Sequence, residues 1–172
     1  MRVAVTGATG LLGGHSTAAL LAAGHEVTAL VRDERRLDEA MASLGVERPD
    51  AVGLSAVVGD MTDPDAVRAA LDGADAVLHC AALVTLDRRR ADEMLAANPL
   101  GLRTVVDAAL ERGIRRIVHT SSTSALQMPP GRPLTPDAPV AGSSLAYARS
   151  KASCEELARR YQGEGAPLVV SY

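Results

Sequence analysis

The sequence predicts an α/β fold in which helices flank both faces of a doubly wound parallel sheet. Short runs of aliphatic residues alternate along the chain with longer segments of helical composition. Glycines follow several of the helical segments, as expected at helix ends, and a glycine-rich turn joins the first aliphatic run to the first helix. Since the chain has 172 residues, of which 47% are hydrophobic, we expect one domain spanning 1–172.

The first expected strand, Arg2 to Val5, leads into this turn, whose glycines have a G-x-x-G-x-x-G spacing and overlap the start of an Ala/Leu-rich helix at 12–23. Glycine fits because the turn needs unusual backbone angles, phosphates must approach the backbone and the helix must pack on the strand. The helix start also offers free N–H groups and a positive dipole end. An ordinary glycine-rich turn is the alternative, but the flanking strand and helix favour a pyrophosphate site. The predicted cofactor-binding residues are Gly7, Thr9, Gly10, Leu11, Leu12 and Gly13.

The second expected strand, Glu26 to Val31, is followed by Arg32 and Asp33. In a dinucleotide-binding sheet of this kind, the tip of that strand meets the adenosine ribose. An acidic residue there binds the 2′-hydroxyl, whereas an arginine accommodates a 2′-phosphate. Because Arg32 occupies the tip and Arg35 and Arg36 follow closely, we predict NADP as the cofactor. NAD stays possible because Asp33 is adjacent, and surface charges without a ligand are the other interpretation.

The third and fourth expected strands, 54–58 and 76–80, end beside residues that suit an adenosine. Asp60 can accept the adenine amino group, and Met61 can pack on the ring. As an alternative, Asp60 only caps the short helix 65–71, although Asp63 before a proline makes a good N-cap there. Ala81 and Ala82 follow the fourth strand, and their small side chains leave room for a cofactor across the strand ends.

The remaining elements continue the alternation. Helices are expected at 34–44, 88–112 and 145–162, strands at 114–119 and 167–172, and loops at 45–53, which contains Pro49, and at 127–143. We expect the proline-rich loop 127–143 to lie over the site. The pair Asn98-Pro99 interrupts the long helical stretch, and since proline removes a backbone donor, a kink is expected there. The run Arg88-Arg89-Arg90 indicates a solvated helix start rather than a binding patch.

Composition argues against several classes of partner. A net charge of −3 gives no electrostatic case for nucleic acid or an anionic membrane, and no apolar stretch reaches the roughly 18 residues of a membrane span. The N-terminus reads as a folding strand rather than a signal peptide. Cys80 and Cys154 form no disulfide framework, which favours a reduced, cytoplasmic protein. We interpret His79 as a core histidine with a backbone partner, and we expect no metal at the site.

Lysine usage singles out one position. Of 18 basic residues only Lys151 is a lysine, which suggests that an amine is needed there rather than any positive charge. Tyr147 lies four residues earlier in the helix 145–162, so the two side chains share one face about one turn apart. The fifth strand ends in the hydroxyl-rich run 120–124, whose hydroxyls either cap the strand end or meet a ligand.

Taken together, these residues resemble the short-chain dehydrogenase/reductase family, specifically the extended branch that includes the NAD-dependent epimerases and dehydratases. The resemblance covers essentially the whole chain and rests on Thr6-Gly-x-x-Gly-x-x-Gly13, Asp60, Ala81-Ala82, Asn98, Ser122 and Tyr147-x-x-x-Lys151. Within the branch, the segments 30–33, 79–82 and 118–122 look most like dihydroflavonol and cinnamoyl-CoA reductases and 3β-hydroxysteroid dehydrogenases.

The resemblance implies a six-stranded Rossmann-type sheet with NAD(P) at the strand carboxyl ends, and it implies catalytic roles. Tyr147 would exchange a proton with the carbonyl or alcohol oxygen of the substrate. Because a free phenol has a pKa of about 10, a nearby cation is needed to favour the phenolate; Lys151 would supply it and hydrogen-bond the nicotinamide ribose. Ser122, second in the Ser-Ser pair, would hold the substrate oxygen, and Asn98 would stabilise the kinked helix and a proton-relay water. The hydroxyls that compete with Ser122 are Ser121, Thr123 and Ser124.

The sequence therefore predicts an NADP(H)-dependent oxidoreductase that moves hydride between nicotinamide and a small-molecule carbonyl or secondary alcohol. A nucleotide-sugar epimerase or dehydratase with the same catalytic set is one alternative, and a non-catalytic NADP-sensing module is the other. A homodimer through the fourth and fifth helices is also implied. Extended members are about twice as long, and their C-terminal substrate lobe would follow the sixth strand. We thus expect a shortened chain or part of a longer protein, rather than a natively short one. A natively short chain would have an open substrate site.

Overall fold

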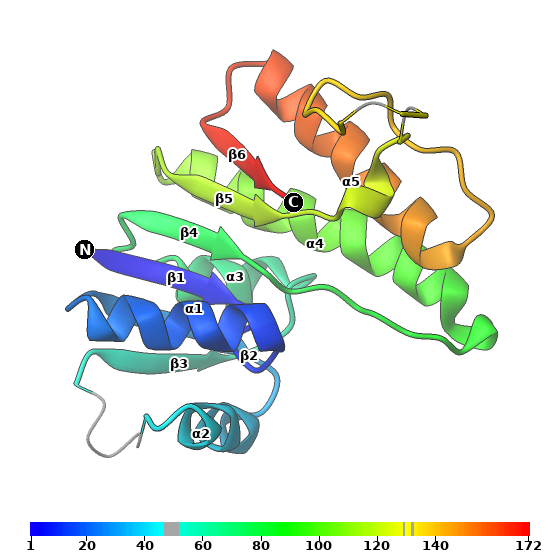
Figure 1. The fold of residues 1–172 in the computed structure, drawn as a ribbon. Coiled ribbons are helices and arrows are strands. Elements are labelled where there is room, and N and C mark those ends of the chain that lie inside the picture. The colour runs from blue at the N-terminus through cyan, green and yellow to red at the C-terminus, as the bar shows by residue number, and fades with distance from the viewer. Residues whose placement is uncertain (47–51, 129, 132) are drawn as a thin grey trace.

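A computed structural model of the chain describes residues 1–46, 52–128, 130–131 and 133–172. Within these ranges, six strands form one parallel sheet in the order β3-β2-β1-β4-β5-β6 (Figure 1). The strands are β1 (Arg2–Thr6), β2 (Glu26–Val31), β3 (Leu54–Val58), β4 (Ala76–His79), β5 (Ile117–Thr120) and β6 (Leu168–Ser171). The helices are α1 (Leu11–Ala22), α2 (Glu34–Ser43), α3 (Pro64–Ala70), α4 (Ala91–Glu111) and α5 (Ala146–Gly163), with 3₁₀ turns η2 (Arg88–Arg90) and η3 (Thr123–Ala125). The predicted doubly wound α/β fold is confirmed.

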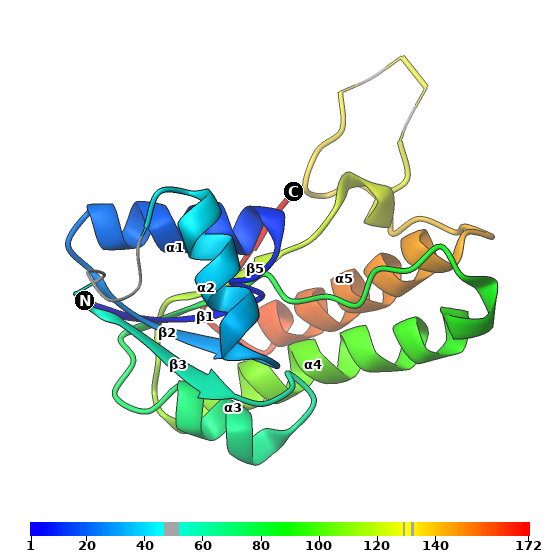
Figure 2. The ribbon, with the colours of Figure 1, turned by 90° about the horizontal axis from the view of Figure 1, so that it is seen from below.

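The sheet is covered on both faces. Helices α1 and α2 lie on one face, and α3, α4 and α5 lie on the other (Figures 1 and 2). Side chains alternate between two apolar cores, so that Val5 and Val27 pack under α1 and α2, whereas Val77 and Ile117 pack under the other three helices. Because both sides of each central strand are buried, the strands read as near-continuous aliphatic runs in the sequence.

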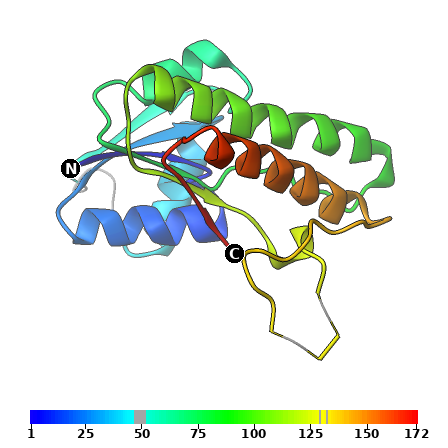
Figure 3. The same cartoon turned by 90° about the horizontal axis from the view of Figure 1, so that it is seen from above.

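The strand order opens a crevice at one edge of the sheet. β1 pairs with β2 on one side and with β4 on the other, and the chain leaves β1 and β4 toward opposite faces. A dinucleotide site is expected at such a switch point, outside the carboxyl ends of the strands. Helices α4 and α5 run side by side and extend past those strand ends (Figure 3), so their first turns can form a wall of the crevice.

Most predicted element boundaries hold. β2 and β3 have the predicted bounds, and most other ends differ from the prediction by one residue. The predicted start of β5 is wrong, because the strand begins at Ile117 rather than at residue 114. Ile114 instead closes α4: its N–H donates to Ala109, Gly113 has a φ of +68° and donates to Leu110, and the Ile114 side chain is buried. This is a Schellman ending, which uses an apolar residue after the glycine.

The stretch predicted as one interrupted helix, 88–112, is different in two respects. It opens with the 3₁₀ turn η2, whose three arginines are exposed as expected. The pair Asn98-Pro99 does not divide the stretch, since α4 continues through both residues as one helix; the kink expected there stays a prediction. Packing of α4 on α5 and on the sheet outweighs the loss of the proline donor.

The two predicted loops are described only in part. The centre of the loop 45–53, with Pro49, lies outside the described residues, as do two positions of the loop 127–143. The base of the second loop is drawn together by an antiparallel bridge between Leu126 and Val140, and the N–H of Ala141 donates to Ala125. Among the described residues, no helix is long and apolar enough to cross a membrane.

Three polar side chains form a buried ladder across the strand ends. Thr6, His79 and His119 stand at neighbouring register positions of β1, β4 and β5. Thr6 Oγ1 lies 2.7 Å from His79 Nδ1, and the two histidine rings stack with centroids 5.2 Å apart. His79 is thus a core histidine, as predicted, but its ring contacts a threonine hydroxyl rather than a backbone group. Neither ring nitrogen of His119 has a hydrogen-bond partner among the described residues.

Both histidines are held neutral. Burial is the main reason that the pKa of His79 lies well below its usual value, and the neighbouring His119 and Lys151 lower it further. Burial, followed by the charge of Lys151, lowers the pKa of His119 to about 3. An imidazole has an ordinary pKa of about 6.5, so both rings take up protons on unfolding below that pH.

We therefore expect the free energy of unfolding to fall as the pH drops below about 6.5. Because each folded-state pKa is depressed, the stability is present above that pH and is lost by about 1.4 kcal/mol per pH unit for each histidine. Urea titrations at about pH 7 and about pH 5.5 measure the loss.

His119→Leu supplies the test of the cause. This variant removes one of the two buried titrations and fills the space with an apolar side chain, so its stability should depend less on pH than that of the wild type. His15→Gln, at an exposed position of α1, is the matched control and should change nothing. Equal pH dependence in the wild type and His119→Leu would contradict the assignment.

Candidate functional site

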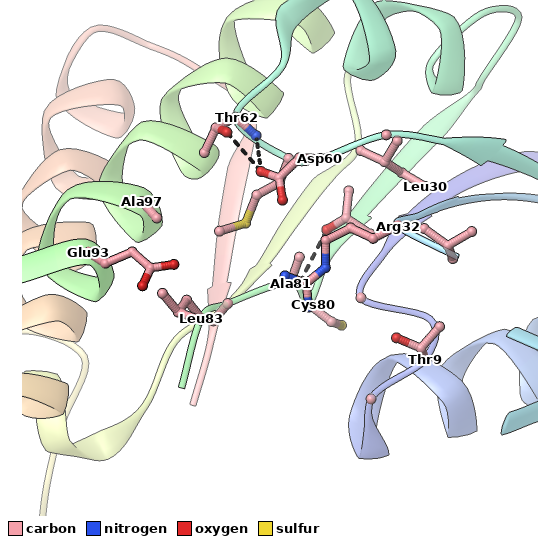
Figure 4. Close-up of a pocket in the computed structure, with 17 residues that line it drawn as sticks. Thr9, Leu30, Arg32, Asp60, Thr62, Cys80, Ala81, Leu83, Glu93 and Ala97 are labelled. Atoms are coloured by element: carbon pink, nitrogen blue, oxygen red, sulfur yellow. Dashed lines mark hydrogen bonds between the residues drawn. The ribbon is translucent and has the colours of Figure 1, made fainter. Parts of the chain in front are cut away.

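A cleft of about 560 Å³ lies at the carboxyl ends of β1, β2, β3 and β4 (Figure 4). The predicted cofactor-binding residues that line it are Gly7, Thr9, Gly10, Arg32, Asp60, Met61, Ala81 and Ala82. Gly13, Leu11 and Leu12 stand just outside, at the start of α1. Asn98, Ser122, Tyr147 and Lys151 do not line this cleft; they belong to α4, η3 and α5 around it. None of the described residues of the loop 127–143 lines it.

The glycine loop is built by close backbone contacts. Gly7 has a φ of +79°, and a Cβ on it would lie 2.6 Å from the backbone nitrogen of Ala81, at the end of β4. A Cβ on Gly13 would lie 2.2 Å from the carbonyl oxygen of Gly7. Gly7 and Gly13 therefore fit the loop between β1, β4 and α1, as the sequence predicts, since any larger residue would push these elements apart.

The start of α1 suits an anion. Its N-cap residue is Gly10, so no side chain accepts a hydrogen bond from the first turn, and that turn holds no acidic residue. Leu11 and Leu12 have exposed side chains, which leaves their backbone N–H groups as their contribution to a phosphate site. Free N–H groups at a helix N-terminus bind phosphates, so the cradle fits the pyrophosphate of a dinucleotide.

The tip of β2 separates its two charged residues. Asp33 is the N-cap of α2: its Oδ1 accepts the Arg35 N–H at 3.0 Å and lies 3.5 Å from Arg35 Nε. These contacts with Arg35, led by the backbone hydrogen bond, lower the pKa of Asp33. Arg32 lines the cleft, whereas Asp33 does not. A ligand in the cleft thus meets the guanidinium rather than the carboxylate.

The end of β3, the strand next to β2, places Asp60 and Met61 in the cleft wall. Asp60 Oδ1 accepts from the N–H of Thr62 at 3.0 Å and from its hydroxyl at 2.8 Å (Figure 4). Asp60 therefore braces the turn before α3, while Asp63 is the residue that caps α3. The side chain of Met61 is nearly buried against Gly101 of α4, where a Cβ would lie 2.7 Å from its sulfur.

Asn98 fixes the segment that follows β4. Its Oδ1 accepts the N–H of Leu83 at 2.7 Å, and its Nδ2 donates to the carbonyl of Leu83 at 3.0 Å and to Ser150 Oγ at 2.8 Å. Ser150 is fully buried and donates in turn to the carbonyl of Met94. Ser150 was not predicted from the sequence; its position directly before Lys151 in α5 was the available signal. Asn98 and Ser150 together tie α4, α5 and the cleft wall.

The predicted catalytic residues surround the end of β5. Lys151 is 5% exposed, and its ammonium donates to the carbonyl of Thr120 at 3.0 Å. Ser122 is the N-cap of η3, where its hydroxyl lies 2.8 Å from Ser124 Oγ and accepts the Ser124 N–H. Tyr147 is half-buried in the first turn of α5, one turn before Lys151. Helix α5, which carries Tyr147 and Lys151 one turn apart, packs against η3, the turn that follows Ser122.

A second buried charge on α5 was not predicted. Glu155 is 1% exposed and accepts from Arg159 Nε at 2.8 Å, from the Tyr172 hydroxyl at 2.7 Å and from Ser121 Oγ at 3.3 Å. Burial, followed by the hydrogen bond to Glu155, raises the pKa of Tyr172 to about 12. Arg159 also donates to two carbonyls of the loop 127–143, at Pro136 and Ala138. Glu155 therefore links β5, β6 and that loop to the helix that carries Tyr147.

The two cysteines are free thiols, as the sequence predicts. Cys80 lines the cleft, with Sγ 3.3 Å from Thr120 Oγ1. Burial raises the pKa of Cys80, and it raises the pKa of Cys154 to about 11. Both thiols are thus protonated at neutral pH, which gives neither the character of a nucleophile.

Comparison with known proteins agrees with the geometry. Residues 3–171 match the NAD dependent epimerase/dehydratase family. A 4-hydroxy-2-methyl-3-oxo-4-farnesyl-3,4-dihydroquinoline-1-oxide ketoreductase from Stigmatella aurantiaca is 34% identical over 99% of the chain and 48% of its own length. Cinnamoyl-CoA reductase 1 from Oryza sativa subsp. japonica is 36% identical over 79% of the chain and 38% of its length. The narrower resemblance to reductases of that group is therefore confirmed.

Solved structures show the same fold. A short-chain dehydrogenase/reductase superfamily protein from Agrobacterium tumefaciens, solved with bound NAD, is 30% identical and superimposes with a TM-score of 0.79 over 99% of the chain and 48% of its own. The chain thus spans about half the length, or less, of the relatives it matches.

Gly13→Ala should disrupt the phosphate cradle. Since its Cβ would lie 2.2 Å from the Gly7 carbonyl, we expect the free energy of unfolding to fall by about 1–3 kcal/mol, together with a loss of dinucleotide affinity. Gly163→Ala is the matched control, because a Cβ at Gly163 meets nothing within 4 Å. Thermal unfolding and dinucleotide titration measure both effects, and a Gly13→Ala protein as stable as Gly163→Ala would refute the packing argument.

Proposed function

Because the chain belongs to the NAD dependent epimerase/dehydratase family, of the extended short-chain dehydrogenase/reductase type, we propose that it is the cofactor-binding part of an oxidoreductase acting on a carbonyl or secondary alcohol. The observation that carries the proposal is the placement of Lys151. Lys151 is 5% exposed, and its ammonium donates a hydrogen bond to the carbonyl of Thr120, two residues before Ser122. Thr120 lies at the end of β5, next to the strand whose end lines the cleft.

The residues of the cleft suit a dinucleotide from end to end. The uncapped start of α1 and the glycine loop would hold the pyrophosphate. Asp60 keeps one carboxylate oxygen outside its Thr62 bonds and would accept the adenine amino group, while Ala81 and Ala82 leave room across the strand ends. When bound, the nicotinamide supplies or accepts the hydride.

Three side chains would handle the proton and the substrate oxygen. Lys151 uses one of its three N–H donors on Thr120, which leaves two for ribose hydroxyls. Its charge lies one helical turn from Tyr147, where it would stabilise the negative charge that develops on the phenol oxygen in the reaction. In the reductive direction the Tyr147 hydroxyl gives its proton to the carbonyl oxygen, and in the oxidative direction the phenolate removes the alcohol proton. Ser122 holds that oxygen beside Tyr147 through a hydrogen bond.

Asn98 acts in this proposal as a positioning residue. Its amide bonds to Leu83 and Ser150 hold the segment after β4 against α4 and α5. The relay water near Asn98 stays a prediction, since α4 runs through Asn98 as one helix.

We also propose NADP rather than NAD as the preferred cofactor. Arg32 lines the cleft, and Asp33 is turned away into the cap of α2. A guanidinium at the tip of the second strand accommodates a 2′-phosphate, which a carboxylate would repel. The Agrobacterium relative was solved with NAD, so the choice rests on these two side chains of the chain itself.

Arg32→Ala should weaken NADPH binding by about 10-fold or more, since a bond to a charged partner contributes about 1.5–3 kcal/mol, and should leave NADH binding nearly unchanged. Fluorescence titration of the purified protein with both dinucleotides measures the ratio. Arg36→Ala, in the first turn of α2 and outside the cleft, is the matched control. Tighter binding of NADH than NADPH by the wild type would refute the NADP preference.

Tyr147→Phe in the whole protein should lower turnover of a carbonyl substrate by about 10²–10⁴-fold, the usual contribution of general acid catalysis, with NADPH binding retained. Consumption of NADPH with a panel of ketones and aldehydes is the measurement. Tyr161→Phe is the matched control, because that hydroxyl donates to Asp107 on the outer side of α4 and α5. Full activity of Tyr147→Phe would overturn the mechanism, and turnover of nucleotide-sugars alone would favour an epimerase or dehydratase.

A further inference from the structure

Three charged side chains line the cofactor cleft in the described part of the chain: Arg32, Asp60 and Glu93. Arg32 comes from the end of β2, and Glu93 comes from the first turn of α4 on the other side of the cleft (Figure 4). With one cation and two carboxylates, the lining carries a formal charge of −1. That balance opposes a 2′-phosphate, which brings a charge of about −1.5 to −2.

The negative charge of each carboxylate is partly offset by hydrogen bonds from a neighbouring residue. Asp60 turns one oxygen to the N–H and hydroxyl of Thr62. Glu93 forms a two-pronged ion pair with Arg90 of η2, with Nε to Oε2 at 2.8 Å and the second guanidinium nitrogen to Oε1 at 2.9 Å. The hydrogen bond from Arg90 is the main cause of the lowered pKa of Glu93, and the charge of Arg32 also contributes. Glu93 therefore faces two arginines, one beside it and one across the cleft.

The pairing has a consequence for cofactor choice. Without Arg90, the Glu93 carboxylate would offset the field of Arg32 and repel a phosphate bound there. With Arg90 in place, the charge of Glu93 is partly offset by a residue outside the cleft, so Glu93 opposes Arg32 less than it would alone. We propose that Glu93, with its charge balanced by Arg90, is a specificity-determining residue that sets how strongly the cleft prefers a 2′-phosphorylated dinucleotide over an unphosphorylated one. The proposal rests on the proposed function, since it requires that the cleft bind a dinucleotide.

Binding ratios of NADPH to NADH test the proposal without a substrate. Glu93→Gln removes the opposing charge and should raise the preference for NADPH about three- to tenfold at low salt, with a smaller change at about 0.5 M salt. Arg90→Gln uncovers Glu93 and should lower the preference by a similar factor. Glu93 and Arg90 are about half exposed, so both variants should fold, and thermal unfolding checks this.

The double variant Arg90→Gln/Glu93→Gln shows whether the two charges offset each other. It removes one charge of each sign, so its NADPH preference should lie near that of the wild type, between the preferences of the two single variants. A double variant whose NADPH preference is as low as that of Arg90→Gln would mean that Arg90 binds the phosphate itself and that Glu93 has no part, and the proposal would be wrong. An unchanged preference in Glu93→Gln would also overturn it.

Arg89→Gln is the matched control for charge. Arg89 is in the same turn but pairs with Asp87 at 3.0 Å, and its side chain is 90% exposed. The Arg89→Gln variant removes the same charge from the same surface and should change the ratio of NADPH to NADH binding less than twofold. A change as large as that in Arg90→Gln would mean that general surface charge causes the effect, and it would refute the proposal. Failure of the wild type to bind either dinucleotide would instead refute the proposed function, and this inference with it.

Discussion

The cleft depends on a backbone contact between the loop after β1 and the end of β4. Gly7 approaches the backbone of Cys80 and Ala81 so closely that no side chain fits between them, and Gly13 approaches the Gly7 carbonyl in the same way. The start of α1 is thereby held against two strands at backbone distance. Its free N–H groups consequently meet the cleft with no side chain in the way. A single methyl group at either glycine would move the helix that forms the phosphate cradle.

Helix α5 organises the other half of the site through one face. Tyr147, Lys151, Glu155 and Arg159 follow one another at intervals of four residues, so their side chains form a line along the helix. Lys151 reaches the end of β5, Glu155 reaches the ends of β5 and β6, and Arg159 reaches the loop 127–143. Helix α5 is thus bonded to Thr120 and Ser121, the two residues directly before Ser122.

The sequence predicts the site well where local chemistry decides the structure. β2 begins two residues after Gly24, and β3 begins directly after Gly53; both glycines have a positive φ. Because the strands are parallel, their carboxyl ends lie at one edge of the sheet. Residues that follow strand ends, such as Arg32 and Asp60, could therefore be assigned to one cleft in advance. Ser150 and Glu155 could not, because their partners lie 52 and 34 residues away. Those contacts depend on how α4 and α5 pack, which no local pattern specifies.

The buried charge of Lys151 adds to the effect of burial in keeping the neighbouring imidazoles of His79 and His119 neutral. The ammonium lowers the pKa of His79 and His119, and protonation of either ring would place a second positive charge beside it. Burial already disfavours that protonation. The neutral imidazoles therefore do not repel the buried ammonium, whereas protonated imidazoles would. Below about pH 6.5, the cost of keeping the imidazoles unprotonated rises, and the core around Lys151 then becomes a source of instability. The fold thus keeps a buried ammonium beside two imidazoles that stay uncharged.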